Sequence, residues 1–151
     1  MFDAESFLNS SVDGVNDTVV IPVPVGEYLG SCEKVDIRTW AKKDDPSQGG
    51  LALDLVWNLE DEALKASLGR DKITVKQGIM LDLTETGGLD MGKGKNISLG
   101  RLREAISLNT PGQPFSFTMI PGRLARLSIS HRPDKNDSSI VYAEVKAVAK
   151  A

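Results

Sequence analysis

The sequence predicts a mainly β protein with one α-helix in the middle of the chain and an extended arm at the N-terminus. Five or six segments alternate apolar and polar residues, which is typical of half-buried antiparallel strands. One stripe of apolar residues at helical spacing stands between them. The length of 151 residues is that of one domain.

Residues 1–25 are expected to form a short helix and then an extended arm, before a folded domain at residues 26–150. Asp3 is placed to cap a helix at Ala4–Leu8, because its carboxylate can accept hydrogen bonds from the first free amides. At Val19–Val25 the sequence VVIPVPV contains two prolines, which exclude a central strand. We therefore predict an arm that packs either on its own domain or on a partner subunit.

Two alternating segments open the folded domain. Between Tyr28 and Trp40, the core face is expected to hold Leu29, Val35 and Ile37. The opposite face is expected to hold aromatic and basic residues, namely Tyr28, Lys34, Arg38 and Trp40. Strict alternation from Leu51 to Leu59 predicts the second strand, with Trp57 in the core.

A short helix, a third strand and the middle helix follow. EDEALKASLGR predicts a helix that ends at Gly69. DKITVKQGIMLDL predicts a strand with Lys72 and Lys76 on its outer face, and Gly78 is expected to form a bulge or bend. ISLGRLREAISL predicts the middle helix, which Asn96 is placed to cap.

A glycine- and lysine-rich loop, TGGLDMGKGK, leads into the middle helix. Its spacing is similar to that of a nucleotide-binding P-loop, but Gly94 stands where the Mg²⁺-binding hydroxyl belongs. The alternating strands also disagree with the parallel sheet that such a site needs. We therefore expect Lys93 and Lys95 to clamp a backbone phosphate of a nucleic acid, with a plain connector as the alternative.

The last strands complete the predicted sheet. Phe115, Phe117 and Met119 alternate and predict a strand segment before a Pro-Gly turn. LARLSIS and IVYAEVKAV predict two strands joined by the loop RPDKNDSS. Strands with one apolar face are buried in a small closed or partly closed antiparallel barrel, which also limits exposed edges. The OB-fold, with its helix between the third and fourth strands, matches this order best.

Composition excludes several other kinds of site. Cys32 and His131 are the single cysteine and histidine, so neither an intramolecular disulfide nor a Cys/His zinc site can form. No apolar run approaches the length of about 18 residues that a membrane helix needs, and a cytoplasmic protein is expected. The acidic residues fall in polar loops or on solvent faces, so we expect no enzyme, no metal and no cofactor.

The charge distribution favours binding of a nucleic acid by a local patch. The net charge is -3, yet residues 1–30 hold five acidic residues and no basic ones, and the remaining chain holds 18 basic and 16 acidic residues. A single DNA strand needs cations along its backbone and flat side chains for its bases. The residues expected to supply them are Lys34, Arg38, Trp40, Lys42, Lys43, Lys72, Lys76, Lys93, Lys95 and Arg126.

Each of these residues also has an ordinary structural explanation. Trp40 could pack beneath the arm, and outward lysines could serve only solubility. A soluble surface of mixed charge would explain the overall balance equally well. Because aromatic residues make up only 5% of the chain, we expect modest binding per site, strengthened by cooperativity or by a homo-oligomer formed through the arm.

The order of these segments resembles phage-encoded single-stranded-DNA-binding proteins of the OB-fold type, over about residues 26–150. The resemblance rests on GEYLGSCEKVDIR, LALDLVWNLED, LGRDKITVKQGIMLDL, ISLGRLREAISL, FTMIPGRLARLSIS and IVYAEVKAVAK. It implies the coating of exposed single strands during replication or recombination in the cytoplasm of an infected bacterium. The chain ends EVKAVAKA, whereas many such proteins have an acidic tail, so recruitment of host partners through a tail is not expected.

Two further hypotheses concern the N-terminal region. The protein could be a structural component of a phage virion, such as a capsid-decorating or tail protein, in which the proline-spaced arm at Val19–Val25 contacts a neighbouring subunit. The barrel would then be only a rigid body. The acidic residues within residues 1–30 could also compete with DNA for the basic face.

Overall fold

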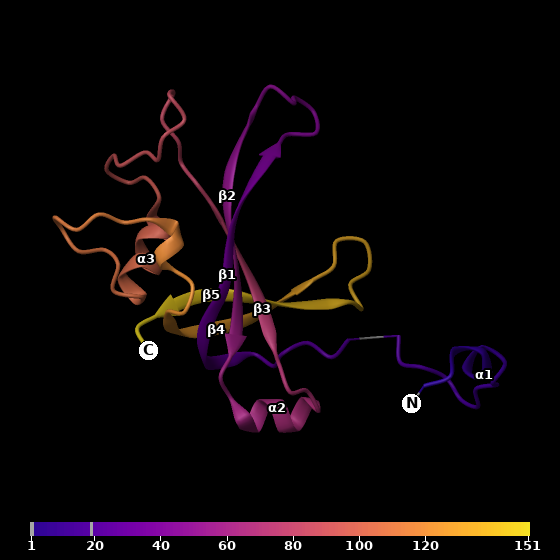
Figure 1. Cartoon of the computed structure of the whole chain (residues 1–151). Helices are drawn as coiled ribbons and strands as arrows, with labels where there is room; N and C mark the ends of the chain where they lie inside the picture. Colours follow the sequence, from indigo (N-terminus) through magenta and orange to yellow (C-terminus); the bar gives the residue numbers. More distant parts are fainter. Residues whose placement is uncertain (1, 19) are drawn as a thin grey trace.

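A five-stranded antiparallel sheet forms the centre of the computed structural model, which describes residues 2–18 and 20–151 (Figure 1). The strands are β1 (Gly26–Ala41), β2 (Gly49–Leu59), β3 (Thr74–Met80), β4 (Leu124–Pro133) and β5 (Val141–Ala149). Their order in the sheet is β3-β2-β1-β4-β5. The long central strand β1 pairs with β4 through its first half and with β2 through most of its length. The predicted mainly β class is therefore confirmed.

The sheet is not closed into a barrel. The edge strands β3 and β5 approach each other, but neighbouring strands are hydrogen-bonded only in the order β3 to β5 through β2, β1 and β4. The open seam between these two edges adjoins the groove described below. The predicted OB-type barrel is therefore not confirmed.

In the described residues, three short α-helices and one 3₁₀-helix accompany the sheet. They are α1 (Ala4–Leu8), α2 (Glu62–Leu68), α3 (Ile97–Ala105) and η1 (Phe117–Met119). As predicted, the Asp3 carboxylate accepts hydrogen bonds from the amides of Glu5 and Ser6 at the start of α1. Gly69 ends α2 in the left-handed conformation, with a φ of 64°. None of the helices in the described part of the chain has the length and apolarity needed to cross a membrane.

The core lies between one face of the sheet and α3. Trp57 is fully buried, as predicted, and its indole Nε1 donates a 2.9 Å hydrogen bond to Oε1 of Gln77. Leu99 and Leu102 of α3 pack into the same cluster of buried residues. The opposite face of β1, β2 and β3 is therefore free to carry a site.

Two local predictions were wrong. Phe117 and Met119 lie in a 3₁₀-helix instead of a strand, because the hydroxyl of Ser116 caps a turn at this point. Phe115 and Phe117 then meet edge to face, with ring centroids 5.2 Å apart. Gly78 forms no bulge and pairs with Asp54 in regular register.

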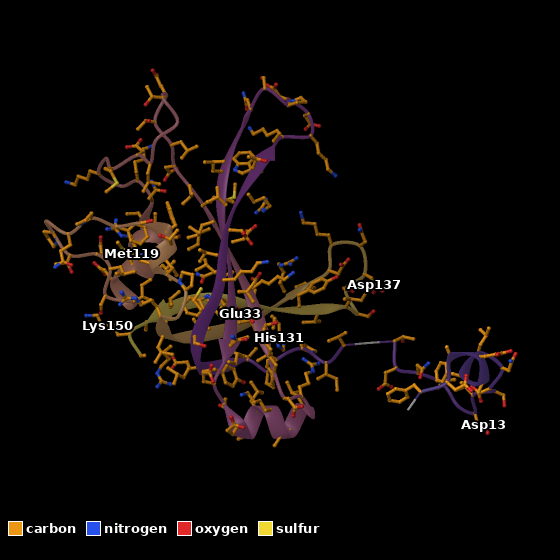
Figure 2. All side chains as sticks on the ribbon, in the orientation of Figure 1. Asp13, Glu33, Met119, His131, Asp137 and Lys150 are labelled. Atoms are coloured by element: carbon orange, nitrogen blue, oxygen red, sulfur yellow. The ribbon has the colours of Figure 1, made fainter. Side chains whose placement is uncertain are left out.

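The arm packs on its own domain just before β1. Arg70 Nη2 donates a 2.9 Å hydrogen bond to the carbonyl of Ile21, and the Tyr28 hydroxyl donates a 2.8 Å bond to that of Pro24. His131 Nε2 lies 2.6 Å from the carbonyl oxygen of Val23, whose side chain is buried. Figure 2 shows His131 close to the body and Asp13 far out on the arm. Of the predicted arm Val19–Val25, Val19 lies outside the described residues.

Candidate nucleic-acid interface

A β-bulge in β1 determines which side chains of this strand lie on the outer face of the sheet. Cys32 pairs with Trp57 and Lys34 pairs with Val56, so Glu33 is an extra residue opposite β2. One inserted residue moves every later side chain of the strand to the other face. The bulge therefore decides which residues of β1 meet solvent together.

The bulge corrects two predicted positions on β1. Tyr28 lies opposite the buried Leu127 and packs against the core, whereas Leu29 lies opposite the exposed Arg126. The prediction of Leu29 on the core face and Tyr28 on the outer face was therefore wrong. After the bulge, Val35 packs against the core as predicted, whereas Ile37, which was also expected on the core face, is 45% exposed.

Four of the predicted contact residues share the outer face of β1, β2 and β3. Lys34, Val56 and Lys76 form one row across the three strands. Because directly opposite residues in an antiparallel ladder point to the same side, both ammonium groups project from this face. Arg38 and Trp40 follow on the same face of β1, at the second and third alternate positions after Lys34.

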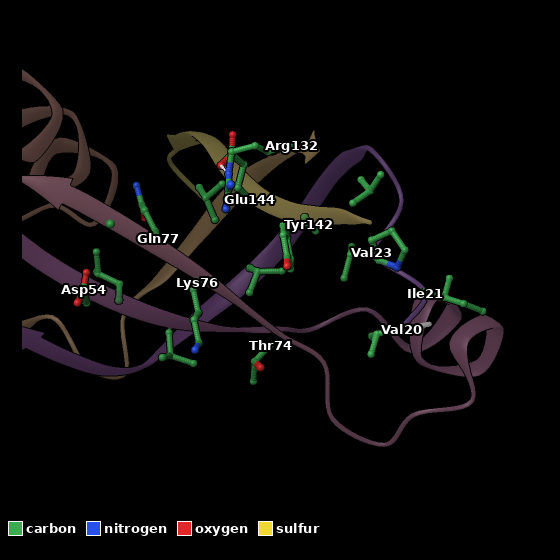
Figure 3. A pocket seen from close by; sticks show the side chains of 18 of the residues that line it. Val20, Ile21, Val23, Asp54, Thr74, Lys76, Gln77, Arg132, Tyr142 and Glu144 are labelled. Carbon is green, nitrogen blue, oxygen red and sulfur yellow. Dashed lines mark hydrogen bonds and ion pairs between the residues drawn. The ribbon is translucent and has the colours of Figure 1, made fainter. Parts of the chain in front are cut away.

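A groove of about 980 Å³ runs along this face, between the arm, β3 and the β4–β5 hairpin. Figure 3 shows Lys76 on β3 and Tyr142 and Arg132 on the hairpin around the groove, with Val20 and Ile21 of the arm at one end. The charged residues of its lining are Lys34, Asp36, Asp54, Arg70, Lys76, Arg132 and Glu144. The groove thus brings together side chains from five separate parts of the chain.

Several cations of the groove are held by neighbouring groups. Lys34 Nζ lies 3.4 Å from a carboxylate oxygen of Asp36, and Arg132 Nε lies 3.1 Å from one of Glu144. These pairs are solvent-exposed, so a phosphate can replace the carboxylate at low cost. Within residues 2–18 and 20–151, no ion pair involves Lys76. Its charge is therefore the most available one in the groove.

Tyr142 supplies a flat surface beside these cations. The guanidinium carbon of Arg132 lies 5.3 Å from the centroid of the Tyr142 ring, and 43% of the tyrosine is exposed. Its hydroxyl donates a 2.8 Å hydrogen bond to Asp134, which raises the pKa of Tyr142. The pKa of Asp134 is lowered, first by the amide of Asn136 and then by this hydroxyl. The ring is thus held in place while the residue stays partly exposed.

Arg38 and Trp40 do not line the groove and are engaged within the sheet. Arg38 Nε donates a 2.8 Å hydrogen bond to Asp54, and this contact raises the pKa of the guanidinium group. Trp40 is half-buried and covers Gly50, where an added Cβ would lie only 3.2 Å from the indole nitrogen. That nitrogen has no hydrogen-bond partner among the described residues. Trp40 therefore serves first to cover a glycine, and its outer surface remains the predicted stacking surface.

The other predicted cations lie outside the groove. Lys42 and Lys43 are exposed in the loop between β1 and β2, at the far end of that hairpin. Lys72 forms an ion pair with Glu33 at the bulge. Arg126 is exposed on β4, between Leu29 of β1 and Ala149 of β5. A strand bound in the groove would not need these four residues.

The loop that carries Lys93 and Lys95 leads into α3, away from the groove (Figure 1). Asp90 accepts a 2.8 Å hydrogen bond from the amide of Gly92, and Asp82 accepts one of 2.8 Å from the amide of Asn96. Carboxylates of the chain itself thus occupy two amides that a phosphate would need. This arrangement gives the phosphate-clamp prediction no support, although both lysines are exposed.

The predicted cap of α3 was wrong. The Asn96 side chain makes no capping hydrogen bond, and its residue adopts a left-handed conformation with a φ of 52°. Its Oδ1 instead accepts from the amide of Asp82, and its Nδ2 donates to the carbonyls of Asp82 and Asp90. Asn96 therefore closes the loop at its base. The long-range partner explains why a local capping rule gave the wrong role.

Three groove residues with basic or aromatic side chains, Arg70, Arg132 and Tyr142, were absent from the predicted set. Arg132 and Tyr142 are direct partners across the β4–β5 ladder, and Arg70 holds the arm. The sequence contained one usable signal. If RPDKNDSS is the loop of a hairpin, Arg132 and Tyr142 lie at nearly opposite positions of the two strands. Their position beside Lys76 depends on how the hairpin packs, which no local pattern gives.

The chain was also compared with known proteins. None of the models of known protein families and none of the curated protein sequences matches it.

Proposed function

We propose that this protein binds single-stranded DNA without catalysing a reaction, and that the groove holds the strand. The observation that carries the proposal is the convergence of Lys34, Lys76 and Arg132 with the exposed ring of Tyr142 along one groove. Proteins that bind single strands combine a cationic track for the backbone with aromatic surfaces for the bases. The cations and the aromatic ring both line the same groove of about 980 Å³.

The order of the strands supports an OB-type barrel that is open on one side. The chain runs β1, β2, β3, α3, β4 and β5, and β1 pairs with both β2 and β4. OB-folds are partly open five-stranded Greek-key barrels, and they bind oligonucleotides on the face of strands 2 and 3 between the 1–2 and 4–5 loops. The groove lies along that face, beside the β4–β5 hairpin. Fold and site thus favour the same ligand.

The proposed mechanism is sequestration. Lys76 attracts the phosphate backbone, and Lys34 and Arg132 exchange their exposed carboxylate partners for phosphates. A base stacks on the partly exposed Tyr142, and a longer strand reaches Trp40 along the same face of the sheet. With few aromatic residues, affinity per molecule is modest. The resemblance of the sequence to phage single-strand-binding proteins favours a role in replication or recombination.

A titration with a labelled oligonucleotide tests the proposal. The fluorescence anisotropy of an oligo-dT of about 15 nucleotides would be followed at about 50 and 200 mM salt. If three phosphates are neutralised, the affinity should fall about 20-fold between the two salt concentrations, since single strands give a slope of about -0.7 per phosphate. Absence of binding at the lower salt concentration would reject the proposal.

A structural role in a virion is the second candidate. The predicted arm packs on its own domain through Ile21, Val23 and Pro24, so the exposed segment before it is the observation that favours this candidate. Phe7, Leu8, Val12 and Val15 are exposed and contact no core. Such side chains suit burial against a neighbouring subunit. Stoichiometric recovery of the protein from purified phage particles, together with no binding of oligo-dT, would support this candidate against the first.

A further inference from the structure

The N-terminal segment Phe2–Leu8 combines exposed apolar and acidic side chains. Phe2, Phe7 and Leu8 are 102%, 80% and 81% exposed, respectively, so the apolar side of α1 is covered by nothing. Asp3 and Glu5 lie in the same short segment, and the chain contains no basic residue before Lys34. Exposed aromatic residues next to charges of one sign are typical of a segment that is buried on a partner.

The body of the protein holds the arm at its base and presents this segment outward. The carbonyl groups of Ile21 and Pro24 accept hydrogen bonds from side chains of the folded domain, and Val23 is buried between them. Figure 1 shows α1 well away from the sheet, on the opposite side of the molecule from α3. The segment therefore does not reach the surface around α3 of its own molecule.

The surface at the start of α3 has the complementary character. Residues 91–103 contain four basic residues and no acidic one. Met91 is 75% exposed and Ile97 is 50% exposed, beside the exposed Lys93 and Lys95. Arg101 is exposed one helical turn after Ile97, on the same side of α3. Within the described part of the chain, the ion pairs include none of these three cations.

We propose that Phe2–Leu8 of one molecule docks on the Met91–Arg101 surface of a second copy. The apolar side chains Phe2, Phe7 and Leu8 would cover Met91 and Ile97, while the acidic residues of the segment meet the lysines. The glycine-rich loop thereby gains a role that the groove does not give it.

The contact is head-to-tail, because the donor segment and the acceptor surface lie on different sides of each molecule. Repetition of such a contact produces open chains instead of closed dimers. A small, charged interface of this kind is weak and is screened by salt. Open chains would also suit the coating of a long strand, but the association itself requires no nucleic acid.

Sedimentation velocity of the full chain without DNA tests the contact. At low salt the average mass should rise with protein concentration, and it should return to that of the monomer at about 1 M salt. Glu5→Lys should abolish the association, as should Lys93→Glu combined with Lys95→Glu. An equimolar mixture of these two proteins should associate again, because the unchanged segment of the Lys93→Glu and Lys95→Glu protein then meets the unchanged surface of the Glu5→Lys protein. Arg126→Glu, on β4, is the matched control and should associate like the unchanged protein.

Three results would overturn the proposal. The first is a monomer at every concentration at low salt. The second is association that survives both charge reversals. The third is unchanged association in Glu5→Lys accompanied by tighter binding of oligo-dT, which would assign the acidic segment to the groove. Failure of DNA binding alone leaves these readouts unaffected, so the two proposals fail independently.

Discussion

Lys34 and Lys76 lie on either side of Val56 in one row across β1, β2 and β3, with both side chains on the same face of the sheet. Two strand spacings separate them, which is about 10 Å. Two cations at this distance define a track across the groove instead of a single point of charge. The β-bulge at Glu33 creates the row, because it sets the phase of β1 against β2.

Replacement of one of these lysines should change the salt dependence of DNA binding. Among the described residues, no carboxylate forms an ion pair with Lys76. Lys76→Glu therefore removes an available cation and should weaken binding of oligo-dT at low salt. The slope of log affinity against log salt should become shallower by about 0.7. Arg126→Glu changes the net charge equally but lies outside the groove, and its slope should match that of the unchanged protein. Equal effects of both variants would show that only net charge matters.

Two substitutions of Tyr142 distinguish the contribution of its ring from that of its hydroxyl. Tyr142→Ala should weaken oligo-dT binding by about 1 to 3 kcal/mol, since it removes a surface for one base. Tyr142→Phe keeps the ring and loses the hydrogen bond to Asp134, so it should retain most of the affinity. Anisotropy titrations of the two variants side by side provide the measurement. If the phenylalanine variant binds as weakly as the alanine variant, stacking is not the function of the ring.

The two tryptophans should differ in their effect on folding. Trp57→Ala empties a fully buried position and loses the hydrogen bond to Gln77, so it should reduce the free energy of unfolding by about 3 to 5 kcal/mol. Trp40→Ala should cost less, because this half-buried ring covers only Gly50. The folded Trp40→Ala protein should nevertheless bind oligo-dT more weakly. Urea unfolding followed by circular dichroism, paired with anisotropy, measures both effects. Equal destabilisation by both substitutions would contradict the assigned environments.

Cys32 should make the stability fall at alkaline pH. Burial raises the pKa of its thiol from 9.0 to about 11, and Glu33 adds to the rise, while a hydrogen bond with the backbone of Lys34 lowers it. The folded state thus keeps this proton more tightly than the unfolded chain. Its contribution is fully present below pH 9 and is lost as the pH rises towards 11.

Urea unfolding between pH 8 and about 11 measures the decline. Cys32→Ala lacks the thiol but keeps the other groups that titrate in this range, so its stability should fall less steeply. The slopes are compared instead of the absolute values, because removal of a buried side chain lowers stability at every pH. Parallel slopes for the two proteins would show that the thiol does not titrate differently in the folded state.

The strands of the fold could be predicted because their signal is local. Alternation from Leu51 to Leu59 has a period of two residues, and that period directly sets which side of a strand is buried. The bulge at Glu33 could not be found in this way, because it exists only in the pairing of β1 with β2. Leu29 and Tyr28 were consequently assigned to the wrong faces.

The site was predictable only on the neighbouring strands β1, β2 and β3. Lys34 and Lys76 share a face because both lie on outward positions of alternating strands. Arg132 and Tyr142 join them through packing of the β4–β5 hairpin, which depends on contacts distant in sequence. Lys93 illustrates the converse, because a glycine-rich loop looks like an anion site until its own carboxylates are placed.

The location of bound DNA decides whether the groove is the binding site for a single strand. Amide NMR spectra of the isotope-labelled full chain would be recorded during titration with oligo-dT. If the groove holds the strand, the largest shifts fall on β1 and β3 around Lys34 and Lys76 and on the hairpin around Tyr142, with small shifts in α3. Shifts concentrated in residues 91–103, or a spectrum that does not change at low salt, would contradict binding in the groove.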